Sequence, residues 1–495
     1  MKRVVSASLM KESDSYTIKN ITPSLELMKR AGDGVFSLLP NGSVAIVCGK
    51  GNNAGDGYVI ALNLQKSGRE CHIFLVEESF SSDGKHYFDM AKGLGVPVSL
   101  IDGETSLNGY DVIVDCIFGI GFLGEPSGKY KRAIEKINEA EGFVVSVDIN
   151  SGLNADSGRA KVAVKSDLTV AIGEYKSGHF LADARDFIGS LNVIDIGILI
   201  QGEGFSLFEG EDASKILKKR KSNSHKGSYG YIALIGGSVE YSGAIKLANL
   251  GASALRTGAG VVRLACPKSI VNGVLPYVLE STIYQMPDDE NGLVFDEDSI
   301  NGAINGASTV AIGMGLGKGE GKAKIVEYLL KSYEGNLIID ADGLNALSTL
   351  DKDLIKNSRA RLVLTPHPKE FSRISGALLN DVLNNPVFEA MAYAKRMGVT
   401  LLLKGNTTIV TNGEECVLLP YGTPGMATGG SGDVLSGVLA GVISSNDASL
   451  FENVCLGAYI TAMAGISAEG ELGEISQLPS DTIRHLPRVI KEIAK

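Results

Sequence analysis

Short runs of consecutive apolar residues alternate with helix-like stretches along this chain, and the alternation occurs twice. In the first half the apolar runs lie at 43–48, 71–76, 111–116, 143–148 and 167–172. The stretches 58–67, 85–94 and 128–140 suit helices that cross between strands. Continuous apolar runs are typical of strands covered on both faces, as in a parallel sheet. The first half therefore predicts a doubly wound α/β domain with a helical N-terminal extension.

The second alternation begins at residue 231 and includes the runs 261–266, 308–314, 336–340, 361–366 and 400–405. Long helical segments follow Ala427 and Phe451. A polar stretch with an acidic patch and the basic run KKRKSNSHKG (218–227) separates the two alternations, and we interpret it as a solvated linker rather than a nucleic-acid patch. A length of 495 residues also favours more than one core. We expect α/β domains at 1–205 and 225–495, joined by a linker at 206–224.

The charge balance and the cysteines narrow the class of protein. A formal net charge of −10 argues against non-specific binding to nucleic acid or to an anionic membrane. The six cysteines lie far apart, so buried thiols are favoured over disulfides or a zinc site. The start shows no apolar core of a signal peptide, and we find no run close to the ~20 apolar residues of a membrane span. A cytoplasmic location is expected.

The segment GKGNNAGDG (49–57) lies between an expected strand and an expected helix. Such a turn presents free backbone N–H groups and the positive end of a helix to an anion. Asn52, Asn53 and Asp56 add oxygen ligands at the carboxyl edge of the sheet, where α/β proteins bind ligands. Further polar side chains follow the strand ends at 111–116 and 143–148: Asp115, Asp148, Asn150 and Ser151. A tight structural turn and helix caps are the alternatives, but several polar strand ends at one edge favour a site.

Together these motifs resemble the NAD(P)H-hydrate epimerase family over about residues 5–200. The resemblance implies that the phosphates and the nicotinamide side of the hydrate are held by Asn52, Asn53, Ala54, Gly55, Asp56, Gly119, Ile120, Gly121, Phe122, Leu123, Gly124 and Glu125. It implies a monovalent cation, potassium, bound by Asn53, Asp115 and Ser151, and acid–base work by Asp148. The chain departs from the family where Asn150 replaces Pro, where Ile120 replaces Thr, and where Tyr175 interrupts a Pro-Lys pair before Lys176.

The segment YGTPGMATGGSGDVLSG (421–437) places several glycines directly before an expected helix. The main-chain amides of such a turn form an anion hole with room for phosphate. Asp433 is the carboxylate at the end of this hole, where it could take a proton from a substrate hydroxyl. A capped helix start without a ligand is the alternative interpretation.

This segment resembles ribokinase-like small-molecule kinases, and motifs over about residues 222–490 resemble their NAD(P)H-hydrate dehydratase branch. The resemblance implies that Gly317, His367 and Asp433 contact the hydrate, with Asp433 as base. ADP would be held by Lys404, Gly405, Asn406, Thr407, Thr408, Gly429, Gly430, Ser431 and Gly432. Asp340 and Asp342 would orient Mg²⁺ or cap the following helix, and we favour capping.

The sequence therefore predicts an N-terminal Rossmann-like αβα sandwich and a C-terminal ribokinase-like α/β domain. The implied function is repair of hydrated NAD(P)H by an epimerase fused to an ADP-dependent dehydratase. The expected partners are NAD(P)HX and ADP, without nucleic acid or membrane, and a homo-oligomer is expected. The alternative is a vitamin-precursor kinase fused to a non-catalytic nucleotide-binding domain. ADP is favoured over ATP because the two-domain fusion looks bacterial or archaeal.

Overall fold

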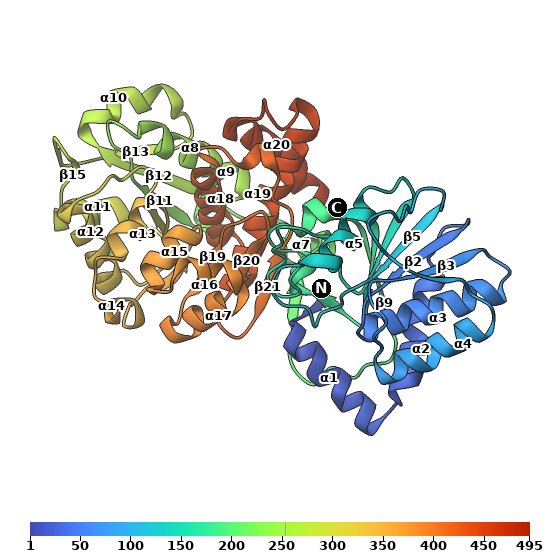
Figure 1. The fold of residues 1–495 in the computed structure, drawn as a ribbon. Helices are drawn as coiled ribbons and strands as arrows, with labels where there is room; N and C mark the ends of the chain where they lie inside the picture. The colour runs from blue at the N-terminus through green and yellow to red at the C-terminus, as the bar shows by residue number, and fades with distance from the viewer. Residues whose placement is uncertain (253) are drawn as a thin grey trace. The chain divides into compact units, whose positions relative to one another are not determined.

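The computed structural model describes residues 1–252 and 254–495 and divides the chain into two compact units (Figure 1). The N-terminal unit comprises Arg3–Phe205, and the C-terminal unit comprises Ser206–Lys495 together with Met1–Lys2. The division falls where the first alternation of apolar runs and helices ends.

The N-terminal unit is built on a parallel sheet with the strand order β4-β3-β2-β5-β6-β7-β9. Its strands are β2 (Val44–Cys48), β3 (Cys71–Leu75), β4 (Val98–Leu100), β5 (Val112–Cys116), β6 (Phe143–Val147), β7 (Ser166–Ile172) and β9 (Ile188–Ile194). The chain moves outward from β2 in one direction and then from β5 in the other, so the crevice between β2 and β5 is the switch point at which α/β sheets bind ligands. This topology confirms the doubly wound domain. Outside this sheet, β1 (Lys2–Val5) pairs in parallel with β8 (Tyr175–Lys176).

Helices cover both faces of this sheet, as the continuous apolar runs require. One face packs against α2 (Ser24–Phe36), α3 (Asn52–Lys66) and α4 (Ser82–Gly93), and the other against α5 (Gly128–Asn138). The alternation along β2 shows this directly, because Ile46 belongs to the first core cluster and Val47 to the second. Helix α1 (Ala7–Asn20) forms the expected N-terminal helical extension, and α6 (Ala184–Phe187) is a single turn.

The C-terminal unit contains a mixed sheet with the strand order β13-β12-β11-β16-β17-β18-β19-β20-β21-β10. Its strands are β10 (Phe205–Leu207), β11 (Tyr231–Ile235), β12 (Val261–Pro267), β13 (Thr282–Met286), β16 (Thr309–Ile312), β17 (Asn336–Ile339), β18 (Arg361–Leu364), β19 (Thr400–Leu403), β20 (Thr408–Thr411) and β21 (Cys416–Leu419), with a separate hairpin of β14 (Asp288–Asp289) and β15 (Gly292–Leu293). The strands from β13 to β19 are parallel, whereas β19, β20 and β21 form an antiparallel meander that the sequence did not predict.

The helices of this unit pack on both faces of its sheet. The largest core cluster joins one face to α8 (Ser242–Ala252), α18 (Ser431–Ser445), α19 (Leu450–Leu472) and α20 (Pro479–Ile493). Strand residues of the opposite face, such as Ile235 and Ile312, are buried as well. The remaining helices are α9 (Ala254–Thr257), α10 (Val271–Val274), α11 (Glu297–Ile304), α12 (Glu320–Ser332), α13 (Asp342–Leu347), α14 (Asp353–Lys356), α15 (Pro368–Ser375), α16 (Leu379–Asn384) and α17 (Pro386–Met397).

The expected linker at 206–224 is folded in its first half. Strand β10 pairs with β21, and α7 (Gly210–Ile216) begins with a capping box between Glu209 and Asp212. Phe208, Ala213 and Ile216 are buried in the main C-terminal core cluster. One apolar side chain before a short helix and two on it are too few to give a visible period, and for this reason the sequence interpretation was wrong here.

Helix α19 bears on the expectation that no segment spans a membrane. Its 23 residues are long and apolar enough to cross a membrane, although glycines, serines and threonines interrupt the apolar run. Two thirds of its most apolar window (67%) is buried inside the C-terminal unit, and Leu456 and Ile460 are fully buried. We therefore interpret α19 as a core helix. All six cysteines are also buried, as expected.

Candidate active sites

Helix α3 begins at Asn52, so the segment NNAGDG forms its first turns rather than a loop. Gly51 is the N-cap, and among the described residues no side chain caps the helix by a hydrogen bond. Gly57 lets the first turns of α3 pack closely against β5. A Cβ at this position would lie only 2.9 Å from the sulfur of Cys116. The first N–H groups of α3 are thus presented at the switch point, where an anion is favoured.

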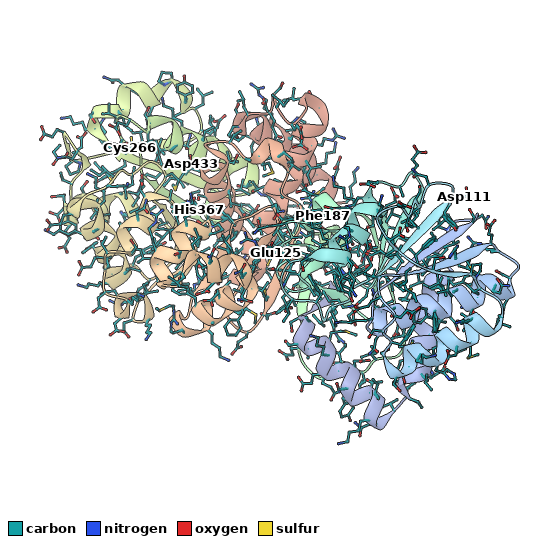
Figure 2. The ribbon with its side chains drawn as sticks, in the orientation of Figure 1. Asp111, Glu125, Phe187, Cys266, His367 and Asp433 are labelled. Atoms are coloured by element: carbon teal, nitrogen blue, oxygen red, sulfur yellow. The ribbon has the colours of Figure 1, made fainter. Side chains whose placement is uncertain are left out.

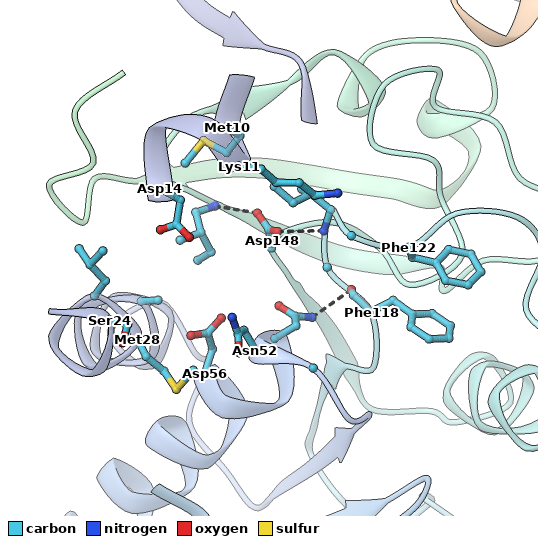
Figure 3. A pocket seen from close by; sticks show the side chains of 18 of the residues that line it. Met10, Lys11, Asp14, Ser24, Met28, Asn52, Asp56, Phe118, Phe122 and Asp148 are labelled. Atoms are coloured by element: carbon cyan, nitrogen blue, oxygen red, sulfur yellow. Dashed lines mark hydrogen bonds between the residues drawn. The ribbon is translucent and has the colours of Figure 1, made fainter. Parts of the chain in front are cut away.

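A cavity of about 560 Å³ opens at this helix start. Its lining comes from α1, α2, the start of α3 and the loop 117–123 after β5. Single residues of α4, β7 and β8, one residue after β6 and two residues after β9 complete it. Figure 3 shows Asp14 and Asp56 pointing toward the same space as Asp148. Four carboxyl groups, those of Asp14, Asp56, Asp83 and Asp148, therefore line one cavity together with the ammonium of Lys176.

Asp148 lies directly after β6 in a left-handed backbone conformation, with φ of 67°. Its Oδ1 accepts a hydrogen bond from Lys176 Nζ at 2.5 Å, and its Oδ2 accepts one from Ile120 N at 3.3 Å. A Cβ on Gly119 would lie 3.2 Å from Asp148 Oδ2, so glycine there lets the loop approach the carboxylate. Burial raises the pKa of Asp148, but Lys176 outweighs burial and the net shift is downward. Asp148 is therefore ionised near neutral pH.

His179 holds the main chain of Asp148 in place. Its Nδ1 accepts a hydrogen bond from Lys176 N at 3.1 Å, which leaves Nε2 to donate to Asp148 O at 2.8 Å. Burial, and next the nearby Lys176 ammonium, lower the pKa of His179 to about 4. A neutral imidazole with a fixed tautomer is therefore part of the support of Asp148. The sequence analysis missed His179, for which it offered no motif.

The pKa values of Asp56 and Asp14 shift in the opposite direction to the pKa of Asp148. Burial, and next the charge of Asp148, raise the pKa of Asp56 well above its ordinary value, and the same two causes raise the pKa of Asp14. The cavity therefore combines Asp148, whose pKa is lowered, with Asp56, whose pKa is raised. Carboxyl groups whose pKa values are pushed apart in one cavity are suited to act as an acid and a base.

Asp115 and Ser151 lie below the cavity floor and support the loop that lines it. Asp115 accepts hydrogen bonds from Ser151 Oγ at 2.6 Å, Ser151 N at 2.9 Å, Ser146 Oγ at 2.9 Å and Ile117 N at 3.2 Å. Ser151 Oγ accepts a hydrogen bond from Phe118 N at 2.8 Å. Asn53 Nδ2 donates to Phe118 O at 3.0 Å, while Asn53 Oδ1 is buried without a hydrogen-bond partner among the described residues. The three expected cation ligands thus meet around the Phe118 main chain.

The structure separates the expected substrate-binding residues into two groups. Those that line the cavity are Asn52, Asn53, Asp56, Gly119, Ile120, Gly121, Phe122, Leu123 and Asp148. Ala54 is buried in the core, and Gly55 lies against Met28 of α2, so only their main chain is placed to bind. Gly124 and Glu125 follow the lining part of the loop, and Glu125 is exposed and paired with Lys161 at 2.7 Å. Binding roles for both groups of residues remain predictions.

The Asn150 departure has a structural explanation. Its Nδ2 donates to Val164 O, Ser166 Oγ and Phe187 O at 2.9 Å each, and its Oδ1 accepts from Thr169 Oγ1 at 2.5 Å. A buried side chain with four hydrogen bonds fixes this turn without the ring of a proline. Asn150 thus anchors the turn between Asp148 and Ser151.

The C-terminal unit places Asp433 in the first turn of α18, whose N-cap Gly430 is left-handed with φ of 103°. His367 and Asp433 both lie in this unit (Figure 2). Burial, and next the neighbouring Asp340, raise the pKa of Asp433 to about 7. Among the described residues, no heavy atom lies within 4 Å of the position that a Cβ would take on Gly429. The glycine-rich turn thus has the open main chain that phosphate binding needs.

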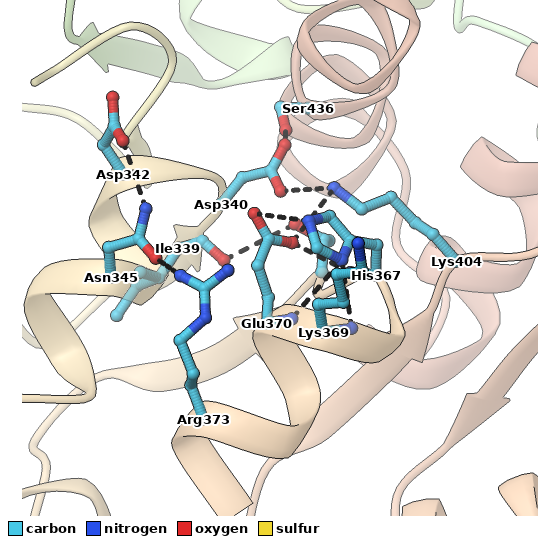
Figure 4. Close-up of polar contacts among 11 residues, drawn as sticks. Ile339, Asp340, Asp342, Asn345, His367, Lys369, Glu370, Arg373, Lys404 and Ser436 are labelled. Atoms are coloured by element: carbon cyan, nitrogen blue, oxygen red, sulfur yellow. Dashed lines mark hydrogen bonds and ion pairs between the residues drawn. The ribbon is translucent and has the colours of Figure 1, made fainter. Parts of the chain in front are cut away.

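Asp340 is the centre of a buried polar network beside this turn (Figure 4). Its Oδ1 accepts from Lys404 Nζ at 2.7 Å, and its Oδ2 accepts from Ser436 Oγ of α18 at 2.7 Å. Burial lowers the pKa of Lys404, but Asp340 and Glu370 outweigh it, and the net shift is upward. A Cβ on Gly432 would lie 3.4 Å from Lys404 Nζ, so a fixed positive charge stands at the start of α18.

His367 is the N-cap of α15. Its Nδ1 accepts from Lys369 N at 3.1 Å and Glu370 N at 3.3 Å, and Glu370 Oε2 accepts from His367 N at 2.9 Å. Burial, and next Lys404, lower the pKa of His367, which favours the neutral ring with its proton on Nε2. The sequence analysis expected a substrate contact, and the structure adds a capping role that orients the half-exposed ring.

Asp342 anchors the other expected substrate loop. Its Oδ2 accepts a hydrogen bond from Gly317 N at 2.9 Å, and its Oδ1 accepts one from Asn345 Nδ2 at 3.2 Å. Among the described residues, no side chain caps α13 by a hydrogen bond. The preference for Asp340 and Asp342 as caps was therefore wrong, because both carboxylates are used to connect loops around the site.

The remaining expected ADP residues surround the same edge of the sheet. Residues 404–408 connect β19 to β20, where Thr407 N donates to Asn406 Oδ1 at 2.8 Å and Gly422 N donates to Asn406 O at 2.9 Å. The hydroxyls of Thr428 and Ser431 lie 3.4 Å apart at the glycine-rich turn. The turn after β19 and the glycine-rich turn therefore border the predicted nucleotide site around Lys404.

Comparisons with known proteins cover both units. Family models described as NAD(P)H-hydrate dehydratase and as YjeF-related protein N-terminus match residues 232–488 and 24–178. The bifunctional NAD(P)H-hydrate repair enzyme Nnr of Moorella thermoacetica is 32% identical over 497 residues, which cover 95% of this chain and 93% of the relative.

Solved structures match the C-terminal part of the chain. A ribokinase-like superfamily protein of Enterococcus faecalis is 23% identical with a TM-score of 0.52, and the match covers 59% of this chain and 96% of that protein. The ADP/ATP-dependent NAD(P)H-hydrate dehydratase of Bacillus subtilis, co-crystallised with ATP and Mg²⁺, is 27% identical with a TM-score of 0.51, covering 58% and 99%.

The fold and the two sites thus define a two-unit α/β protein with a ribokinase-like C-terminal unit. The chain belongs to the family of bifunctional NAD(P)H-hydrate repair enzymes. This membership confirms the resemblance found in the sequence, and it supports that interpretation over the vitamin-precursor kinase.

Proposed function

We propose that this chain repairs hydrated NAD(P)H at two sites. The N-terminal unit interconverts the R and S epimers of NAD(P)HX, and the C-terminal unit dehydrates the S epimer to NAD(P)H while ADP is converted to AMP and phosphate. The observation that carries the proposal is Asp433, a carboxylate with a pKa of about 7 in the first turn of a glycine-rich helix start. Family membership over nearly the whole chain supports it.

Epimerisation requires that the hydroxyl leave the hydrated ring carbon and that water return on the opposite face. Protonated Asp56 is placed to donate its proton to the departing hydroxyl, so that water leaves and the ring nitrogen lone pair forms a double bond to the carbon. Water then adds to the other face and returns a proton to Asp56. The ionised Asp148 stabilises the positive charge of the ring between these steps.

Lys176 and His179 act through Asp148 as positioning residues. Lys176 is 1% exposed, and its ammonium also donates to Ile172 O at 2.7 Å, so its place is fixed. Its ammonium lowers the pKa of Asp148 and so keeps this carboxylate ionised beside the protonated Asp56. Without the ammonium, Asp148 would bind a proton more readily and would compete with Asp56 for it.

The oxygen atoms around Phe118 fit a potassium ion. Asn53 Oδ1 is buried and unpartnered among the described residues, and it belongs to a group that also contains Ser151 Oγ and Asp115. Amide, hydroxyl and carboxylate oxygens are the ligands that hard cations take. A bound cation would supply local positive charge to the loop that contacts the phosphates and the hydrate. We propose Asn53, Asp115 and Ser151 as its ligands.

Dehydration begins when Asp433 takes the proton of the hydrate hydroxyl. The oxygen then forms a bond to the terminal phosphorus of ADP, and the bond from phosphorus to AMP breaks. Lys404 and the N–H groups at the start of α18 stabilise the negative charge that develops on the phosphoryl oxygens. Phosphate next leaves the ring with its electron pair, a proton leaves the adjacent ring carbon, and the dihydropyridine is restored.

ADP is the proposed co-substrate, with Lys404–Thr408 and Gly429–Gly432 as its site and with Gly317 and His367 at the hydrate. Mg²⁺ typically joins such sites through nucleotide phosphates, waters and one or two carboxylates. Asp342 fits this role better than Asp340, because its hydrogen-bond donors are neutral, whereas the charge of Asp340 is already paired with the Lys404 ammonium. The ion would screen the phosphate charges during transfer.

The test uses the full chain with purified R-NADHX or S-NADHX, with and without ADP, and follows the absorbance of NADH. We expect the S epimer to react in a fast ADP-dependent phase and the R epimer to react more slowly. Asp433→Asn should abolish both phases, and Asp148→Asn should slow only the R epimer. Reactions without protein measure spontaneous epimerisation. Equal rates for both epimers in the Asp148→Asn variant would remove the epimerase from the proposal.

The net charge and the buried thiols support a proposal for the cellular setting. A net charge of −10 disfavours nucleic acid and anionic membranes as partners, and six buried thiols suit a reducing cytoplasm. NAD(P)HX and ADP are therefore the proposed partners, and the cytoplasm is the proposed location. A homo-oligomer stays a prediction, which light scattering of the purified chain would test.

A further inference from the structure

A charged cluster that the proposed mechanism does not use lies at the edge of the N-terminal cavity. Glu77 follows β3 by two residues, and its carboxylate accepts hydrogen bonds from the Lys129 ammonium and the Tyr130 hydroxyl of α5. Lys50 Nζ lies 3.8 Å from Glu77 Oε1. We call Lys50, Glu77, Lys129 and Tyr130 the Glu77 cluster.

Stability alone does not explain this cluster. Lys50 and Lys129 are 62% and 44% exposed, and ion pairs with such exposure contribute little to folding. The hydrogen bonds from Lys129 and Tyr130 lower the pKa of Glu77, so the carboxylate is ionised. Two ammonium groups thus surround one carboxylate, and each group has solvent on one side.

The cluster is connected to the cavity by two routes. Lys50 lines the cavity and directly precedes Gly51, the N-cap of α3. The Tyr130 ring stacks on Phe118 at a centroid distance of 4.9 Å, and Phe118 stacks on Phe122 at 4.1 Å. Figure 3 shows these two phenylalanines together at one side of the cavity, away from Asp14 and Met28. A long ligand at the start of α3 would therefore reach the Glu77 cluster.

The sheet topology indicates which part of a dinucleotide would arrive there. With the hydrated ring at Asp148 and the pyrophosphate at the start of α3, the adenosine half continues past Lys50. In doubly wound α/β proteins, an acid at the end of the strand next to the phosphate-binding strand accepts a hydrogen bond from the adenosine ribose. Glu77 follows β3, which pairs with β2.

We propose that the Glu77 cluster binds the adenosine ribose of the hydrate and that Glu77 makes the epimerase site favour NADHX over NADPHX. The proposal rests on the function proposed above and names the substrate preference of that site. The 2′-hydroxyl of NADHX donates to Glu77, whereas the 2′-phosphate of NADPHX is repelled by Glu77 and must compete with it for Lys50 and Lys129.

The test measures conversion of R-NADHX and R-NADPHX to their S epimers by the full chain, without ADP so that the dehydratase is silent. Glu77→Gln should raise KM for NADHX about tenfold, the loss expected for one charge-assisted hydrogen bond, and should lower KM for NADPHX. Lys129→Met should act in the opposite direction and raise KM for NADPHX more than for NADHX. Lys131→Met is the matched control, because Lys131 lies on the same helix and pairs with Glu135 at 3.7 Å.

The ratio of the KM for NADHX to the KM for NADPHX decides the proposal. Because both substrates are measured on the same variant, a folding defect would affect both KM values and would leave their ratio unchanged. An unchanged ratio in Glu77→Gln and Lys129→Met overturns the proposal, as does a wild-type preference for NADPHX. If the wild-type chain converts neither substrate faster than the reaction without protein, the proposed function itself fails and the two failures are distinguished.

Discussion

Replacing Asp433 by Asn separates the chemistry of this residue from its effect on stability. The carboxylate ionises with a pKa of about 7 in the folded protein, against an ordinary value of 3.8, because it is buried beside Asp340. At about 1.4 kcal/mol for each tenfold change in proton affinity, this shift corresponds to roughly 4 kcal/mol of destabilisation when the group is ionised. The side chain is only partly buried, so we expect about 2 kcal/mol.

The sign of the effect follows from the two pKa values. Below pH 3.8 the carboxyl group is protonated in both the folded and the unfolded chain, and it has no effect. Between 3.8 and about 7 the unfolded chain releases the proton first, so stability falls as pH rises. Above about 7 the full destabilisation is present. Asp433→Asn should therefore stabilise the C-terminal unit at pH 8, and about a third of the gain should remain at pH 5.

Calorimetry of the full chain measures this effect, since the sequence contains no tryptophan for fluorescence. A gain of about 2 kcal/mol should raise the Tm of the C-terminal transition by roughly 4 °C. The same variant should lose ~10²–10⁴ of the dehydration rate. In the wild-type chain the rate should rise with pH through about 7, as the base ionises. Asp447→Asn, at an exposed position just after α18, is the control and should change neither quantity.

Two results would refute this reasoning. An Asp433→Asn variant with normal dehydration would show that Asp433 is not the base. A variant that melts lower than the wild type at pH 8 would show that the carboxylate stabilises the fold, which contradicts the burial argument.

Four further predictions follow from the two units. Lys176→Met should slow epimerisation at least about tenfold and shift its pH profile upward, because the pKa of Asp148 rises without the ammonium. Asn53→Ala should raise the potassium concentration that gives half-maximal epimerisation, measured by salt titration. ADP should support faster dehydration than ATP in side-by-side turnover, as the fusion suggests. A fragment of residues 206–495 should melt above one of residues 222–495, because the shorter fragment loses Phe208 and Ile216 from the core, a loss of several kcal/mol.

Each of these has a contradicting outcome. An unchanged pH profile in Lys176→Met, or an unchanged potassium titration in Asn53→Ala, removes the assigned role. Equal or faster turnover with ATP removes the nucleotide preference, and equal melting of the two fragments would place α7 outside the cooperative unit.

The strands and the glycine-rich turns were predictable because their signals are local. Each apolar run in the first domain became a parallel strand, and both glycine-rich segments lie at helix starts. The start of α3 was placed six residues late, because the asparagines and glycines of residues 52–57 favour turns on propensity. Packing of Gly57 against β2 and β5 overrides that propensity.

The rest of the site depends on contacts between distant segments. Nothing near Asp14 or His179 indicates that α1 and the turn after β8 approach Asp148, more than a hundred residues and about thirty residues away along the chain. Likewise, Asp340 was expected to be a cap because a helix follows it, and its partner Lys404 is 64 residues away. A single sequence carries no signal for such pairs, and the polar residue types alone leave several partners possible.

The left-handed backbone of Asp148 has a practical consequence for mutagenesis. Residues other than glycine, asparagine and aspartate are strained at a φ of 67°, by roughly 1–2 kcal/mol. An alanine scan would therefore confuse distortion of the turn with loss of the carboxylate. Asparagine keeps the backbone preference and the shape, glycine relaxes the turn while removing the side chain, and glutamate disturbs both. Comparing these three replacements would assign the loss of activity to the charge, the side chain or the conformation.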